Sequence, residues 1–110
     1  MNILRSQRVA ALIQMELSKL ILKEIELPLG VLATIVSIEV DKKMDRALIG
    51  VSVIPETKKE EVLVRFEKAA GYLQHLLLKK INIKPMPRII FIYDKGPENA
   101  ARVEKLLMGE

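Results

Sequence analysis

Apolar residues recur at helical spacing along the first quarter of the chain. They stand at Val9, Leu12, Ile13, Leu17, Leu20 and Ile21. This spacing predicts an amphipathic helix from Arg5 to about Glu26, which Pro28 and Gly30 then end. Four basic residues lie beside this apolar face, within an arc of about 60° around the helix axis. They are Arg5, Arg8, Lys19 and Lys23. Such a basic stripe is either a binding surface or a solvated flank of the helix.

Alternating apolar and polar residues predict two strands after this helix. The first covers residues 31–40, and it would direct Val36, Ile38 and Val40 toward the core. The second begins near Arg46, and its inward side chains would be Ala47, Ile49, Val51 and Val53. Residues 41–45 are polar except for Met44, and Asp41 and Asp45 suit a turn. We therefore expect an antiparallel hairpin, which Pro55 ends.

A second helical segment follows, and a glycine stands in its middle. Thr57 to Glu60 matches a capping box, which predicts the helix start. The apolar positions are Val62, Leu63, Phe66, Ala69 and Ala70, and beyond Gly71 they continue at Leu73, Leu76 and Leu77. Glycine costs about 1 kcal/mol relative to alanine inside a helix. We therefore expect a break at Gly71 between two helices, the second ending before Pro85. The alternatives are a glycine tolerated in the middle of one helix and a glycine that caps the end of a helix.

The last part of the chain predicts a buried strand and a short helix. PRIIFIYD, residues 87–94, has five large apolar residues in a row. Gly96-Pro97 suits the start of a weak terminal helix. The element order is then helix, strand, strand, helix, break, helix and strand. It predicts an α+β fold in which the helices pack on one face of a three-stranded sheet.

Composition narrows the class of protein. The 110 residues are 50% hydrophobic and 29% charged, which suits one domain over residues 1–110. The chain has no cysteine, which excludes disulfides and thiolate metal sites. The first residues do not resemble a signal peptide, and no apolar run has the length of a membrane span. We expect a cytoplasmic protein with no membrane partner.

The side chains offer no coherent catalytic site. His75 is the single histidine and has no second ligand at metal spacing. Asp94 ends the buried strand, where it serves either as a cap or turn residue or as a catalytic acid. The glycines are isolated at positions 30, 50, 71, 96 and 109, so no phosphate-binding glycine motif is possible. The sequence predicts no enzyme, no metal, no cofactor and no small-molecule substrate.

A basic surface is the remaining functional feature. The formal net charge is +4. The candidate RNA-binding residues are Arg5, Arg8, Lys19, Lys23, Lys42, Lys43, Arg46, Lys79, Lys80, Lys84 and Arg88. Lysine and arginine neutralise phosphates with little sequence preference. Only Tyr72 and Tyr93 are candidates for base stacking, so recognition of folded RNA by shape is favoured.

The element order and several motifs resemble the ribosome-binding factor A family over essentially the whole chain. The motifs are "LVRFEKAAGYL" at residues 63–73 and "KPMPRIIFIYDKGPENAARVEKLL" at residues 84–107. The resemblance implies a type II K-homology-like fold, with an interhelical kink at Ala69, Ala70 and Gly71. Gln74 departs from the family, which commonly has arginine there.

The resemblance also implies a non-catalytic, monomeric assembly factor. Such a factor binds the small (30S) ribosomal subunit and its 16S rRNA, and assists late maturation and rRNA processing, especially in the cold. The alternative interpretation is a protein-protein adaptor whose basic surface meets an acidic partner without RNA.

Overall fold

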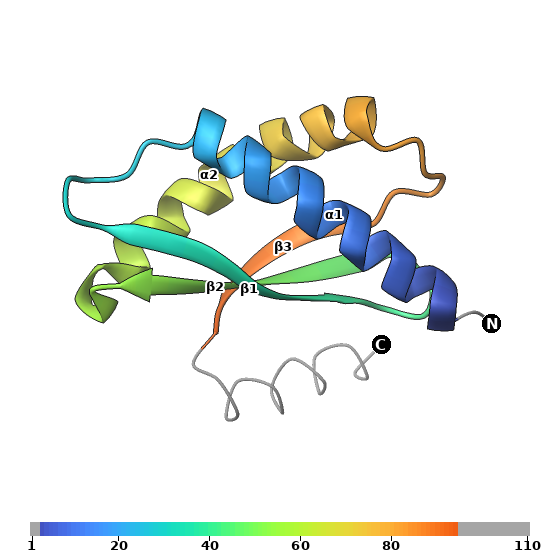
Figure 1. The fold of residues 1–110 in the computed structure, drawn as a ribbon, viewed down its shortest axis with the longest axis horizontal. Helices are drawn as coiled ribbons and strands as arrows, with labels where there is room; N and C mark the ends of the chain where they lie inside the picture. The colour runs from blue at the N-terminus through green and yellow to red at the C-terminus, as the bar shows by residue number, and fades with distance from the viewer. Residues whose placement is uncertain (1–2, 95–110) are drawn as a thin grey trace.

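The computed structural model describes residues 3–94, and within them it confirms the predicted α+β class. In chain order the elements are α1 (Ile3–Glu24), β1 (Leu32–Val40), β2 (Arg46–Ile54), a 3-10 turn η1 (Glu56–Lys58), α2 (Lys59–Lys80) and β3 (Arg88–Tyr93). Figure 1 shows both helices on the same face of the sheet. The terminal helix predicted from Gly96 lies outside the described residues.

The three strands form one mixed sheet in the order β1-β2-β3. β1 and β2 pair antiparallel, as the predicted hairpin requires. β3 pairs parallel with β2 because α2 carries the chain back along the sheet. The inward side chains predicted for β2, at Ala47, Ile49, Val51 and Val53, are all buried.

The hydrophobic core lies between this sheet and the two helices. Ile13 and Leu17 of α1 are fully buried. Phe66 of α2 is 1% exposed and meets Phe91 of β3 edge to face, with ring centroids 5.0 Å apart. The core therefore joins α1, α2 and β3 into one packed body.

The inward face of β1 differs from the prediction at one residue. The register with β2 shifts between Ile35 and Ser37, so Val36 is an extra residue in a β-bulge. Ile38 and Val40 pack against the core as predicted, but Val36 is 49% exposed. The prediction for Val36 is wrong because it assumed that side chains alternate strictly along the strand. An inserted residue interrupts this alternation.

The predicted division of the second helical segment into two helices is wrong, whereas the kink expected at Ala69, Ala70 and Gly71 stays a prediction. α2 runs uninterrupted through Ala69, Ala70 and Gly71, and its path curves over the sheet in Figure 1. Its buried residues are Val62, Phe66, Leu73 and Leu77. They keep one helical phase across Gly71, so the burial of that face outweighs the cost of one glycine, about 1 kcal/mol. The φ angle of Gly71 is not positive, so this position does not use the freedom of glycine.

The start of α2 does not use the predicted capping box. Thr57 lies inside the 3-10 turn that follows Pro55, and neither η1 nor α2 begins with a side-chain cap. The backbone N–H of Lys58 donates to the carbonyl of Pro55 at 3.0 Å and closes this turn. A backbone carbonyl, rather than the Thr57 hydroxyl, therefore accepts a hydrogen bond from a backbone N–H at this helix start.

Candidate nucleic-acid interface

The fold brings most of the predicted cations to one end of the molecule. Three segments meet there: the start of α1, the hairpin tip 41–45, and the chain from the end of α2 to the start of β3 (Figure 1). The backbone N–H of Arg88 donates to the carbonyl of Asp45 at 3.0 Å. The guanidinium of Arg5 donates to the carbonyl of Lys84 at 3.2 Å. These two contacts tie the three segments together.

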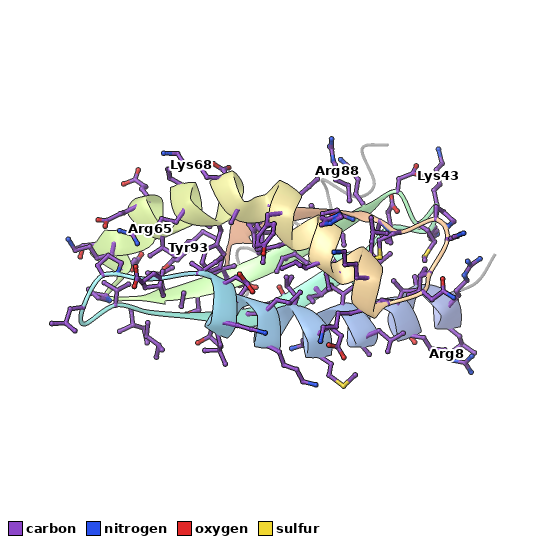
Figure 2. All side chains as sticks on the ribbon, turned by 90° about the horizontal axis from the view of Figure 1, so that it is seen from above. Arg8, Lys43, Arg65, Lys68, Arg88 and Tyr93 are labelled. Carbon is purple, nitrogen blue, oxygen red and sulfur yellow. The ribbon has the colours of Figure 1, made fainter. Side chains whose placement is uncertain are left out.

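We call this region the cationic end. Its basic residues are Arg5, Arg8, Lys42, Lys43, Arg46, Lys79, Lys80, Lys84 and Arg88. All are exposed except Arg46, which is half-buried. Figure 2 shows Arg8, Lys43 and Arg88 toward one end of the long axis, with Arg65 and Lys68 toward the other.

The hairpin tip holds Lys42 and Lys43 outward by means of a buried carboxylate. Asp41 is 7% exposed, and its Oδ1 accepts the backbone N–H groups of Asp45 at 2.7 Å and Arg46 at 3.2 Å. Met44 has φ 64° and is 6% exposed, so its side chain anchors the turn in the core. The turn role predicted for Asp41 is confirmed, and its acid group serves the backbone.

Gln74 of α2 fixes the backbone on both sides of Arg88. Its Nε2 donates to the carbonyl of Pro87, and its Oε1 accepts the N–H of Ile89, both at 2.9 Å. The amide therefore pairs with the outer edge of β3 as a neighbouring strand would. Sequence reasoning missed this role, because the only signal was a departure from the family pattern.

Few carboxylates neighbour these cations along the described part of the chain. In residues 3–94, the acids close to the cationic end in sequence are Glu39, Asp41 and Asp45. No ion pair within the same range involves Lys42, Lys43, Lys79, Lys80 or Lys84. These five exposed lysines therefore contribute a positive potential, which attracts polyanions.

Lys19 and Lys23 do not join this cluster. They lie 14 and 18 residues beyond Arg5 along α1, which corresponds to about 21 and 27 Å of helix. Lys19 also lies 3.9 Å from Glu16. The basic stripe predicted along the first helix is therefore divided between two separate regions.

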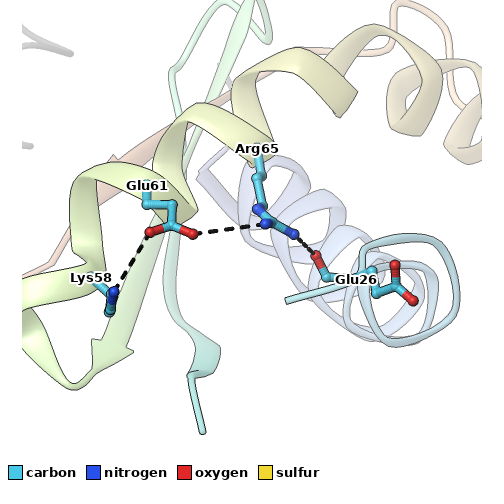
Figure 3. Close-up of polar contacts among 4 residues, drawn as sticks. All are labelled: Glu26, Lys58, Glu61 and Arg65. Atoms are coloured by element: carbon cyan, nitrogen blue, oxygen red, sulfur yellow. Dashed lines mark hydrogen bonds and ion pairs between the residues drawn. The ribbon is translucent and has the colours of Figure 1, made fainter. Parts of the chain in front are cut away.

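Three cations at the opposite end, Lys58, Lys59 and Arg65, are paired with acids, whereas Lys23 and Lys68 have no ion pair within residues 3–94. We use "opposite end" for the end of α1, the 25–31 loop, η1 and the first turns of α2. Figure 3 shows Glu61 between Lys58 at 3.9 Å and Arg65 at 3.7 Å, while Arg65 also donates to the carbonyl of Glu26. These contacts connect the start of α2 to the loop that follows α1.

The two aromatic candidates for base stacking have different environments. Lys59 lies 3.8 Å from Glu56, and its ammonium also stands over the ring of Tyr93, 4.9 Å from the centroid. Tyr93 is therefore already in contact with a cation. Tyr72 is 54% exposed on α2.

Asp94 has a partner across the sheet. Its Oδ2 accepts the hydroxyl of Ser37 at 2.9 Å. A Cβ at Gly50, which pairs with Ser37 in the sheet, would come within 2.2 Å of the Ser37 hydroxyl and 2.8 Å of Asp94 Oδ2. The absence of a side chain at Gly50 therefore provides the space for this contact.

His75, the single histidine, is exposed. Within residues 3–94, no three histidine or acidic side chains gather in an arrangement suited to a metal ion. Over the same range, neither helix has the length and apolar character needed to cross a bilayer.

Comparison with known proteins gives a consistent result. A family model described as ribosome-binding factor A matches residues 5–107. The ribosome-binding factor A of Halothermothrix orenii is 32% identical over 104 residues, which cover 94% of this chain and 85% of the relative. That of Nitrosococcus oceani is 33% identical over 104 residues, with 94% and 82% covered.

Solved structures of that family share the fold. The crystal structure of ribosome-binding factor A from Thermus thermophilus has a TM-score of 0.71 at 19% identity, covering 80% of this chain and 93% of that one. A Thermus thermophilus homology model fitted into the cryo-EM map of a complex with the 30S subunit has a TM-score of 0.67 at 20% identity, with 77% and 90% covered. This likeness confirms the predicted K-homology-like fold.

Proposed function

This chain belongs to the ribosome-binding factor A family, and we propose that it binds the small ribosomal subunit through 16S rRNA during late maturation, without catalysing a reaction. The observation that carries the proposal is the cationic end, where nine basic side chains from three segments gather and five of the lysines have no ion pair within residues 3–94. We place this activity in the cytoplasm and on a monomer.

The physical basis for binding is charge neutralisation. Each lysine or arginine that meets a phosphate releases condensed counterions, which gives affinity with little sequence preference. Folded RNA presents its phosphates on a rigid helical surface, so a rigid cluster of cations recognises shape. Asp41 and Gln74 supply that rigidity by fixing the hairpin tip and the start of β3.

Binding alone is enough to assist maturation. A protein that binds one rRNA conformer more tightly than its alternatives shifts the population toward that conformer by its differential affinity. The proposed contacts are the nine residues of the cationic end. Lys19 and Lys23 are excluded from this contact set because α1 carries them away from it.

A salt series on two targets tests this function. Affinity is measured for purified small subunits and for protein-free 16S rRNA, with the unmodified chain and with a variant in which Arg5, Arg8, Lys42 and Lys43 are changed to Glu. We expect log affinity to fall linearly with log salt, by about 0.7–0.9 per phosphate contacted. We expect the variant to lose affinity for both targets and to have a shallower slope.

Two results would reject the RNA mechanism. The first is unchanged affinity and slope in the variant. The second is binding to small subunits but not to 16S rRNA at low salt, which would favour an adaptor that contacts an acidic protein. Circular dichroism of the variant verifies that its fold is intact.

A further inference from the structure

The outer face of α1 carries an apolar stripe that contacts no other described element. Leu4 is 64%, Met15 50% and Leu22 85% exposed, and Ala11 is exposed between them. The spacings of 7, 4 and 7 residues place these four within an arc of about 40°. The core side of the helix is already filled by the buried residues Val9, Ile13, Leu17 and Leu20. The outer stripe is therefore a second apolar surface.

This stripe follows most of the length of α1. From Leu4 to Leu22 it covers 18 residues, or about 27 Å of helix. Scattered surface leucines are normal, whereas aligned apolar side chains indicate a contact surface. A helix of a partner protein can pack against such a stripe where the two helices cross. Its contacting side chains are then spaced three and four residues apart.

The charges nearest the stripe are positive, and one acid, Glu16, lies just beyond them. Arg8, Lys19 and Lys23 follow one side of it, and all three are exposed. The other side carries Gln7, Gln14 and Ser18. Lys19 lies 3.9 Å from Glu16, but an exposed pair of this kind contributes little and leaves the lysine able to exchange partners.

We propose that the outer face of α1 docks an amphipathic helix of a protein partner, in which acidic residues flank an apolar stripe. This surface is distinct from the cationic end and goes beyond the rRNA binding proposed above. RNA phosphates gain nothing from exposed leucine and methionine side chains, which argues against rRNA as the occupant. A second copy packed antiparallel is disfavoured because the two-fold axis would place the cation side of one α1 beside that of the other.

A peptide panel tests the charge and the stripe separately. The first peptide is a 21-residue helix with leucine on one stripe and glutamate beside it. The second has lysine in place of glutamate, and the third has the same composition as the first in scrambled order. Binding is measured by titration of the ¹⁵N-labelled full chain, which also maps the contacted residues, with folding verified by circular dichroism.

Matched substitutions locate the site. The test variant is Met15→Asp/Leu22→Asp on α1. The control is Val64→Asp/Leu78→Asp on α2, where the side chains are 46% and 50% exposed. We expect only the first peptide to bind, with perturbations along α1, at least tenfold weaker binding by the test variant, and less than twofold change in the control.

Three results would overturn the proposal. One is equal binding of the glutamate and lysine peptides, or no binding of either. Another is a loss of affinity for protein-free 16S rRNA in the test variant, which would assign the face to RNA. The third is concentration-dependent dimerisation that the test variant abolishes, which would assign it to a second copy. Because the peptide assay contains no ribosomal component, its result is independent of the salt series.

Discussion

The two ends of the molecule differ in how many of their basic side chains are paired with acids. At the opposite end, Lys58 and Arg65 share the carboxylate of Glu61, and Lys59 meets both Glu56 and the ring of Tyr93. At the cationic end, the hairpin tip uses its buried acid, Asp41, to hold the backbone. Lys42 and Lys43 beside it stay exposed. The position of acids, more than the number of cations, therefore distinguishes a structural charge cluster from a candidate binding surface.

The hydrophobic core connects the two ends of the molecule. A substitution in the core should therefore cause the largest loss of stability. Phe66→Ala removes a ring that is 1% exposed and in contact with Phe91. We expect a loss of about 3–5 kcal/mol in the free energy of unfolding. Val64→Ala on the exposed side of the same helix should cost less than about 0.5 kcal/mol. Urea denaturation of both variants measures this, and similar losses would contradict the described packing.

Gln74→Ala should lower the local stability of the cationic end more than that of the opposite end. The change leaves the carbonyl of Pro87 and the N–H of Ile89 without their amide partner, at a cost of about 1–3 kcal/mol. Hydrogen exchange should accelerate at Ile89 while the 25–31 loop keeps its rate. Equal acceleration at both ends would mean that Gln74 has no local role.

Gly71→Ala tests whether one continuous helix connects the two ends. A Cβ at Gly71 meets no atom within 4 Å, and the surrounding backbone is helical. We therefore expect a gain of about 0.5–1 kcal/mol in the free energy of unfolding, with unchanged affinity for small subunits. Destabilisation, or weaker binding with the fold intact, would restore a special role for glycine here.

The smallest effect concerns the ion pairs of the opposite end. Glu61→Gln removes the partner of Lys58 and Arg65, both partly exposed, so we expect a loss below about 1 kcal/mol that shrinks with added salt. Lys42→Gln/Lys43→Gln should leave stability unchanged. Thermal denaturation of both variants at low and high salt measures these stabilities. A larger loss of stability in the lysine variant would mean that the lysines of the hairpin tip, and not the ion pairs of Glu61, stabilise the fold.

Local patterns predicted the elements well because each has a strong period or a clear stop signal. The helix ended by Pro28 and Gly30, the hairpin around residues 41–45 and the buried strand after Pro87 all agree with the structure. Two of the errors, the inward position of Val36 and the division of the helix at Gly71, arise where tertiary packing decides. A bulge depends on the neighbouring strand, and a helix crosses a glycine when the sheet buries both of its halves.

The candidate site was less predictable because it depends on which segments meet. The sequence indicated eleven cations, but no local pattern brings Lys84 near Arg5 or Arg88 near Asp45. The sequence also does not show where the other basic segments lie along α1. Lys19 was therefore grouped with Arg5, although only Arg5 lies at the cationic end. The role of Gln74 was not predictable for the same reason, since its partners lie 13 and 15 residues away on another element.

The most direct test changes the same charge at each end. Lys42→Glu/Lys43→Glu and Lys58→Glu/Lys68→Glu alter the net charge equally, and all four side chains are exposed. Affinity for purified small subunits is measured for both variants at low and moderate salt. We predict that the hairpin variant loses at least tenfold in affinity with a shallower salt dependence, while the α2-side variant changes less than twofold. Equal losses in the two variants, or no loss in the first, would contradict a binding surface located at the cationic end.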